Sequence, residues 1–195
     1  MKKLLIANRG EIAIRIARAA AELGIETVAV YPSDDENSLH VKKTDGQTQL
    51  PGTGVAAYLD SQAILDAAKS TRCDAIHPGY GFLSENVEFA KLCEQSGVVF
   101  IGPTPMQLSL FGDKSSARQL AVNSQVPVVP GTNEKTSLEQ ALDFYQSLQN
   151  STDSDNPSML IKAIAGGGGR GMRQVHSLGD VSAEYARCAS EAMSA

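Results

Sequence analysis

The segment from Met159 to Val175 contains the residues whose types and spacing best suit the binding of a phosphate group. A run of four glycines follows a short apolar stretch that carries one lysine, Lys162. Glycine has no Cβ, so successive backbone N–H groups can converge on one anion, and a lysine beside them adds positive charge. We expect a flap that orders over a nucleotide; a flexible hairpin tip with a surface lysine is the alternative. The four glycines are Gly166, Gly167, Gly168 and Gly169.

Two common phosphate-binding motifs do not describe this segment. No Gly-Lys-Ser/Thr sequence ends the glycine run, as a Walker loop requires, and the run lies between two strand-like segments instead of opening a helix. The acidic loop 32–37 follows a predicted strand and could hold a ribose through Asp34. However, the glycine fingerprint of dinucleotide-binding proteins is missing after Ala7. A plain dinucleotide-binding protein is therefore the weaker interpretation.

The three histidines predict no catalytic role. His40 and His176 have no partners in the sequence pattern. His77 stands directly before Pro78 and Gly79, in a loop at the carboxyl end of a predicted strand, where open α/β sheets place their ligands. We expect His77 to order this loop rather than to transfer protons.

The elements that must position these residues alternate between strands and helices in the first half of the chain. Continuous apolar runs are typical of parallel strands that are covered on both faces, so a mostly parallel sheet is expected. Asp60 precedes one predicted helix and suits its N-cap. The predicted strands are 3–7, 27–31, 47–50, 75–77 and 98–101, and the predicted helices are 11–23, 60–70 and 86–96.

The first predicted helix, 11–23, carries an apolar stripe on one side and a charged stripe on the other. The apolar stripe predicts the face that packs on the sheet. The charged stripe is either a solvated face or a contact between subunits. The apolar residues are Ile12, Ile16, Ala19, Ala20 and Leu23, and the charged ones are Glu11, Arg15, Arg18 and Glu22.

The second half of the chain predicts a smaller α+β unit. Asp113 suits the N-cap of a helix whose inward face would be Ala117, Leu120 and Ala121. The breaker-rich segment 126–131 indicates a hinge or a domain edge. The polar segment 150–157 is expected to be a surface loop without assignable chemistry. The remaining predictions are helices at 138–148 and 180–193, a strand at 159–164 and a second extended segment from Met172.

Composition excludes several classes of protein. The chain has 195 residues, of which 42% are hydrophobic, and contains no apolar run of 18 residues, so no membrane span is expected. A net charge of −5 gives no reason to expect a nucleic-acid partner. The first apolar run is interrupted at Asn8, too early for a secretion signal. Cys73, Cys93 and Cys188 lack metal-ligand spacing, which favours reduced core thiols in a cytosolic compartment.

With these segments placed, the chain resembles biotin carboxylase, a family within the ATP-grasp superfamily. The resemblance implies an α/β fold. Its first part, 1–112, is a Rossmann-like (pre-ATP-grasp) parallel-sheet domain. Its second part, 113–195, is the beginning of an α+β ATP-grasp domain whose glycine-rich lid spans about 131–195. The matching segments are 6–13, 75–86, 100–103, 112–114, 126–131 and 162–172.

The family resemblance also implies an activity and a set of binding residues. ATP would activate bicarbonate by phosphoryl transfer, and the carboxyl group would pass to biotin on a carrier protein. The first helix would contribute to a homodimer contact through Arg15, Arg18 and Glu22. The ATP-binding residues by this resemblance are Lys114, Lys162, Gly166, Gly167, Gly168, Gly169 and Met172.

The resemblance places the remaining machinery outside this chain. The ligands of Mg²⁺ or Mn²⁺ and the catalytic residues would lie beyond Ala195, so no catalytic or metal-binding residue is expected within the chain, and no turnover by it alone. The implied partners are a biotin carboxyl carrier domain and a carboxyltransferase component. The implied location is the cytoplasm, or the mitochondrial matrix in a eukaryote. By this resemblance, the same N-terminal part of biotin carboxylase occurs in several enzymes, namely acetyl-CoA, propionyl-CoA, methylcrotonyl-CoA, pyruvate and urea carboxylases.

Three departures and two alternatives accompany this resemblance. Ala165 stands where the family usually has a fifth glycine, Thr44 replaces a common alanine, and the segment 149–158 is longer and more polar than usual. One alternative is another ATP-grasp ligase, of the carbamoyl-phosphate synthetase or peptide-ligase type, although the segments 6–13 and 77–86 argue against it. The other is a non-catalytic module that binds a nucleotide or a partner. Titration with a nucleotide separates these cases.

Overall fold

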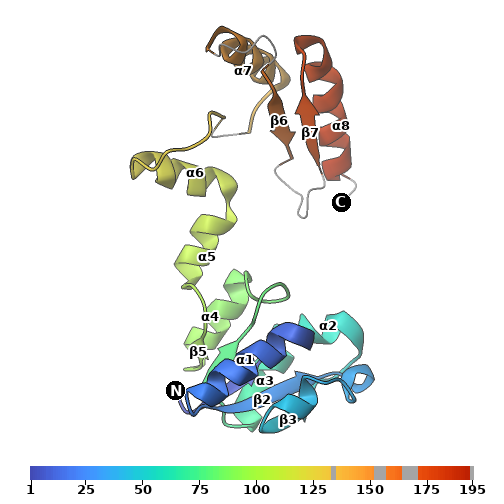
Figure 1. Cartoon of the computed structure of the whole chain (residues 1–195), viewed down its shortest axis with the longest axis vertical. Helices are drawn as coiled ribbons and strands as arrows, with labels where there is room; N and C mark the ends of the chain where they lie inside the picture. The colour runs from blue at the N-terminus through green and yellow to red at the C-terminus, as the bar shows by residue number, and fades with distance from the viewer. Residues whose placement is uncertain (133–134, 152–156, 164–170, 194–195) are drawn as a thin grey trace. The chain divides into compact units, whose positions relative to one another are not determined.

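The fold is given by a computed structural model that describes residues 1–132, 135–151, 157–163 and 171–193. The chain divides into two compact units, Met1–Ala117 and Arg118–Ala195, each of which is described by itself (Figure 1). The predicted α/β fold class is confirmed, because parallel strands alternate with helices in the first unit. No helix in the described ranges is both long and apolar enough to cross a membrane.

The first unit is built on a five-stranded parallel sheet in the order β3-β2-β1-β4-β5. The chain leaves β1 in one direction to form β2 and β3, and returns on the other side to form β4 and β5. The carboxyl ends of β1 and β4 therefore meet at the point where the strand order reverses. The bounds are Lys3–Ile6 for β1, Glu26–Tyr31 for β2, Gly46–Gln49 for β3, Ala75–His77 for β4 and Val99–Phe100 for β5.

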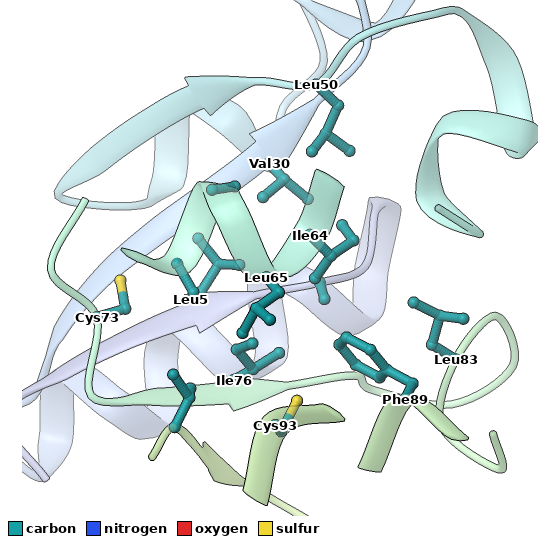
Figure 2. Packing of buried hydrophobic residues seen from close by; sticks show 14 of the residues in the cluster. Leu5, Val30, Leu50, Ile64, Leu65, Cys73, Ile76, Leu83, Phe89 and Cys93 are labelled. Atoms are coloured by element: carbon teal, nitrogen blue, oxygen red, sulfur yellow. The ribbon is translucent and has the colours of Figure 1, made fainter. Parts of the chain in front are cut away.

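Helices cover both faces of this sheet. Leu4 and Ile6 of β1 pack in one cluster with α1, whereas Leu5 packs in a second cluster with α2, α3 and α4. Figure 2 shows the second cluster, in which Leu5 and Ile76 of the sheet lie beside Leu65 of α3. Burial on both faces explains the continuous apolar runs of the sequence. The bounds are Gly10–Glu22 for α1, Gly54–Tyr58 for α2, Ser61–Ser70 for α3 and Val87–Gln95 for α4.

The predicted apolar stripe of α1 is partly wrong. Ile16 and Ala20 are buried as expected, but Ala19 is exposed and Leu23 is 74% exposed. The helix ends at Glu22, so Leu23 no longer follows the helical stripe. The buried residues have the spacing i, i+3, i+4 and i+7 that one helical face requires. They are Ala13, Ile16, Ala17 and Ala20.

The second unit packs two helices against a two-stranded antiparallel sheet. Its core joins Tyr145 of α7 with Met159 of β6, Val175 of β7 and Val181 of α8, and each of these side chains is buried. Helix α7 continues to Ser151, three residues further than expected, and residues 152–156 lie outside the description. The bounds are Leu138–Ser151 for α7, Met159–Lys162 for β6, Met172–Val175 for β7 and Val181–Met193 for α8.

Two further helices lie between β5 and α7 in the sequence, α5 (Pro105–Gly112) and α6 (Lys114–Asn123). The inward face predicted for α6 is wrong, because the helix buries no side chain within the described chain and Leu120 is 36% exposed. Helical spacing of apolar residues shows which side would pack, but it does not supply a surface to pack against. Asp113 does cap α6, accepting a hydrogen bond from the N–H of Ser116 at 2.7 Å.

Candidate functional site

The hairpin of β6 and β7 brings two of the predicted binding residues together. In the antiparallel register Lys162 lies directly opposite Met172, at the end of the hairpin where residues 163 and 171 leave the strands. Both side chains are exposed, while Met159 and Val175 at the other end are buried in the core. Lys162 and Met172 therefore share one face, and their spacing allows a single ligand to contact both.

The same face carries two residues that the sequence reasoning did not single out. Leu160, which is 50% exposed, lies directly opposite Gln174. Each of the two is two residues along its strand from Lys162 or Met172, so all four side chains are on the same face. The period-2 alternation of a strand was the signal that would have found them, because residues i and i+2 point the same way. The face thus combines a positive charge, an amide and two apolar side chains that remain in contact with solvent.

Gly171 pairs with Ala163 at the end of the hairpin that carries Lys162 and Met172. The N–H of Ala163 donates to the carbonyl oxygen of Gly171 at 2.8 Å. Gly171 has a φ of +70°, and a Cβ there would lie 2.9 Å from the Cβ of Ala163, so a larger residue would be strained. The predicted glycines Gly166, Gly167, Gly168 and Gly169 lie outside the described residues, as do Ala165 and Arg170.

The other predicted lysine, Lys114, belongs to the first unit. It is the first residue of α6 and is exposed. Lys162 belongs to the second unit. The structure therefore brings Lys162 and Met172 together, whereas Lys114 is described only in its own unit.

The reversal point of the parallel sheet is closed by an asparagine. Asn8 follows β1 and is 3% exposed; its Nδ2 donates to the carbonyl oxygens of Pro78 at 2.7 Å and Tyr80 at 2.9 Å. Doubly wound folds bind their ligands in the crevice at this point. Here the side chain of Asn8 joins the two loops that would form the crevice. This geometry argues against the dinucleotide-binding interpretation.

Polar residues around this edge of the sheet hold one another. The carboxylate of Asp35 accepts hydrogen bonds from Nη2 of Arg9 at 3.1 Å and from the hydroxyl of Tyr58 at 3.0 Å. Burial, then the bond to Asp35, raises the pKa of Tyr58. The ring of Phe82 stacks on Tyr58 with centroids 5.2 Å apart. Asp34, the ribose candidate, accepts a hydrogen bond at 2.9 Å from the N–H of Gly54, the first residue of α2.

His77 orders its loop as predicted. Its Nδ1 accepts a hydrogen bond from the N–H of Gly79 at 3.0 Å, and burial lowers the pKa of the imidazole, which favours the neutral acceptor form.

The three cysteines are buried and free, which confirms their prediction as small core residues. In the part of the chain that the structure describes, no three His, Cys, Asp or Glu side chains gather to hold a metal ion.

The charged stripe of α1 is exposed along its whole length. Arg15 and Arg18 are neighbours on this face, Glu22 follows one turn later, and Glu11 precedes them. The opposite side of the helix is the buried face that packs on β1. The stripe is therefore a surface feature, available to solvent or to another chain.

Comparison with known proteins decides the family. The model of the biotin carboxylase N-terminal domain matches residues 1–108, more than half of the chain. The chain belongs to the biotin carboxylase N-terminal domain family. Residues 113–195 match a second family, the ATP binding domain of the carbamoyl-phosphate synthase L chain.

Curated relatives of this chain include pyruvate carboxylases. The enzyme of Bacillus subtilis is 48% identical over 198 residues, and the mitochondrial enzyme of Homo sapiens is 47% identical over 199 residues. Each match covers 100% of this chain but only 17% and 16% of those relatives. The chain therefore spans about one sixth of the length of the curated relatives it matches.

Solved biotin carboxylase structures share the fold. The biotin carboxylase domain of a single-chain bacterial carboxylase is 47% identical with a TM-score of 0.81, and the match covers 96% of this chain and 40% of that one. Biotin carboxylase from Campylobacter jejuni, in a complex named for β,γ-ATP, is 39% identical with a TM-score of 0.87 over 99% of this chain and 42% of that one. The biotin carboxylase domain dimer of Hydrogenobacter thermophilus 2-oxoglutarate carboxylase was solved with MgADP, ADP and bicarbonate. That match is 40% identical with a TM-score of 0.86, over 100% of this chain and 42% of that one.

Proposed function

We propose that this chain forms the N-terminal part of a biotin carboxylase that uses ATP and bicarbonate to carboxylate biotin on a carrier protein. The observation that carries the proposal is the cross-strand pair of Lys162 and Met172, exposed on one face of a hairpin in a chain whose residues 113–195 match an ATP binding domain. We also propose that the biotin carboxylase N-terminal domain spans residues 1–112, and that an ATP-grasp domain begins at residue 113 and includes a lid from about residue 131.

Each residue of the hairpin face has a role in this proposal. Lys162 neutralises the phosphates of ATP, and charge neutralisation with positioning supplies most of the rate in phosphoryl transfer. Met172 and Leu160 offer apolar contact to the adenine ring, and Gln174 offers an amide beside it. Lys114, which belongs to the first unit, enters the proposal on sequence grounds alone, as a second lysine for ATP. The glycines from Gly166 to Gly169 enter the proposal on sequence grounds, as backbone donors to the phosphates.

The metal ion that accompanies ATP enters the proposal through the family resemblance. Mg²⁺ takes oxygen ligands, commonly one or two carboxylates together with the phosphates of the nucleotide, and the described ranges hold no cluster of three acidic, histidine or cysteine side chains. In line with the resemblance, we assign the ligands of Mg²⁺ or Mn²⁺ to a part of the biotin carboxylase that this chain does not match. The matched solved domains are about 2.5 times longer than the aligned region, since it covers 40% of one of them.

The proposed partners follow from the same family. A biotin carboxyl carrier domain brings the acceptor, and a carboxyltransferase component, as in a pyruvate carboxylase, uses the product. Arg15, Arg18 and Glu22 are proposed as a homodimer contact, supported by their exposure and by the dimer named for the Hydrogenobacter thermophilus domain. We propose a cytoplasmic location, or the mitochondrial matrix in a eukaryote, as for the Homo sapiens relative.

Another ATP-grasp ligase is the competing function. The match of residues 113–195 alone would suit a carbamoyl-phosphate synthetase, because the domain model carries that name. Residues 1–108 distinguish the two, since they match the biotin carboxylase model. A non-catalytic module would bind a nucleotide or a partner but would not be part of a protein with catalytic residues.

Titration of the chain with a fluorescent ATP analogue tests the nucleotide site. We expect saturable binding, and we expect Lys162→Ala to weaken it about tenfold, as the loss of a charged hydrogen bond does. Lys69→Ala, which removes an exposed lysine at the end of α3, is the matched control and should leave the affinity unchanged. Absence of binding at millimolar analogue, or equal loss in both variants, would refute the site.

A carboxylase assay tests the activity. The chain alone should show no bicarbonate-dependent ATP hydrolysis, because it spans about two fifths of a solved biotin carboxylase domain. A complete biotin carboxylase that contains this chain should hydrolyse ATP only when bicarbonate is present. Turnover that ignores bicarbonate, or that needs ammonia instead, would favour the competing ligase.

A further inference from the structure

Helix α8 presents a stripe of three polar side chains to the hairpin. Glu184, Cys188 and Glu191 have the spacing i, i+4 and i+7, so they lie on one face of the helix. Each of them contacts β7 or the residue that precedes it. The same face of the helix also carries Val181, which is 0% exposed and belongs to the core of the second unit. One helix face therefore supports the whole length of the strand.

Cys188 contacts Gly171, the residue that precedes β7. Its thiol is 2% exposed and donates to the carbonyl oxygen of Gly171, with Sγ 2.8 Å from the oxygen. The same oxygen accepts the N–H of Ala163, which closes the ladder between β6 and β7. Burial raises the pKa of the Cys188 thiol, so it stays protonated and able to donate at neutral pH.

Arg173 forms the second attachment of β7 to α8. Its guanidinium pairs with Glu191, and its Nε lies 3.6 Å from a carboxylate oxygen of Glu184. Glu184 is held in turn by Arg187 at 2.7 Å. Arg173 is half-buried on the side of the strand opposite to the exposed Met172. Helix α8 thus holds Gly171 and Arg173, the two residues that flank Met172.

We propose that Cys188 is a positioning residue, whose hydrogen bond to Gly171 fixes the strand end that presents Lys162 and Met172 to the nucleotide. This inference rests on the proposed nucleotide site. Lys162 depends on the bond because Ala163, its neighbour, shares the Gly171 oxygen with the thiol. Without the thiol, that oxygen would retain the Ala163 bond but lose its link to the helix. Lys162 and Met172 would then sample more positions, and binding would have to order them again.

The test uses the full chain and three variants. Cys188→Ala removes the donor, and Cys188→Ser restores a donor of similar size. Cys93→Ala is the matched control, because it removes the same atoms from a thiol that is 0% exposed in the first unit. Without nucleotide, amide exchange followed by NMR should be about fivefold faster at Ala163 in Cys188→Ala, the effect of one lost hydrogen bond. Cys188→Ser and Cys93→Ala should exchange at this position as the parent chain does.

The affinity for the fluorescent ATP analogue is the second measurement. Cys188→Ala should bind the analogue about fivefold more weakly than the parent chain, in line with the same lost bond. Cys188→Ser should bind it as the parent does, and so should Cys93→Ala even if its melting temperature falls. A role confined to stability would lower the melting temperature without this selective loss of affinity.

The two measurements separate the inference from the proposed function. Ala163 exchange that is equal in the alanine variants, or that serine does not restore, overturns the role of Cys188. Faster exchange with unchanged analogue affinity also overturns it, because the bond would then position nothing that matters to the ligand. A parent chain that binds no analogue, yet shows the exchange difference, refutes the nucleotide site while leaving the contact of Cys188 established.

Discussion

Gly79 leaves room for the side chain of Asn8, which joins the two loops at the point where the strand order of the sheet reverses. It adopts a φ of +69°, and a Cβ added there would lie 2.7 Å from Nδ2 of Asn8, the atom that donates to Pro78 and Tyr80. Alanine would combine backbone strain with displacement of Asn8. We expect Gly79→Ala to lower the free energy of unfolding by about 3 kcal/mol, measured by urea titration.

Gly24 provides the control for this substitution. Its φ of +67° matches that of Gly79, but nothing lies within 4 Å of the position its Cβ would take. Gly24→Ala should therefore cost only the backbone strain, about 1 kcal/mol. Equal losses in the two variants would show that the Asn8 contact contributes nothing to stability.

His40 makes the stability of the first unit depend on pH. It is 1% exposed, Nε2 lies 3.3 Å from the carbonyl oxygen of Val30, and no group in the described residues bonds to Nδ1. Burial lowers the pKa of His40, and the positive charge of Arg9 lowers it further, although the Val30 carbonyl and Asp35 oppose this. The folded protein therefore holds His40 neutral at a pH where the unfolded chain binds a proton.

The direction of the pH effect follows from this difference. Above about pH 7.5 both states are neutral, so His40 contributes no slope; below about pH 6.5 the unfolded state takes up the proton first and stability falls. The slope is at most about 1.4 kcal/mol per pH unit for one proton. Urea titrations between pH 8 and 5 should show a shallower loss in His40→Gln. An unchanged slope in His40→Gln would contradict the account.

At the scale of elements, local sequence signals located most of the strands and helices. Gly24 and Gly97 mark the ends of α1 and α4, and Asn86 caps α4 by accepting from the N–H of Phe89 at 2.9 Å. Such signals depend only on neighbours along the chain, which is why sequence alone predicts them well. The alternation within β6 and β7 also fixed which side chains share the face with Lys162, once the register was known.

The elements that sequence reasoning missed lacked a periodic pattern. Helix α2 has five residues, too few to show a stripe, and α5 is apolar on most sides. The capping box of Thr104 and Gln107, with Pro105 at the first helical position, was the signal that could have revealed α5. Contacts such as Asn8 to Pro78 or Cys188 to Gly171 join distant segments, so no local pattern could have predicted them.

The N-cap of α3 is the element whose predicted cap can be tested most simply. Oδ1 of Asp60 accepts a hydrogen bond from the N–H of Ala63 at 3.0 Å, as the sequence predicted. Asp60→Ala should lower the free energy of unfolding by about 1 kcal/mol, because the first turn of the helix loses its acceptor. Asp60→Asn keeps an acceptor and should stay close to the parent value. Urea titration checks both, and an equal loss in both would assign the effect to charge instead.

At the scale of the whole molecule, the two units have separate hydrophobic cores. The clusters around β1 and β4 contain residues of the first unit only, and the cluster around Tyr145 contains residues of the second unit only. Each core stabilises the unit whose residues it contains. The first unit carries the exposed stripe of α1, and the second carries the hairpin face with Lys162 and Met172, so the proposed dimer contact and the proposed nucleotide contact belong to different units.

The separate cores lead us to expect that each unit unfolds on its own. Ile76→Ala in the first unit and Met159→Ala in the second each remove a buried side chain, at a cost of about 3 kcal/mol to the unit concerned. Urea titration followed by NMR signals from each unit should show that Ile76→Ala lowers the midpoint of the first unit only. Met159→Ala should do so for the second unit only. A common midpoint that moves in both variants would mean that the units unfold as one body. The burial of Ile76 in the core of the first unit would then also stabilise the second unit, to whose core Ile76 does not belong.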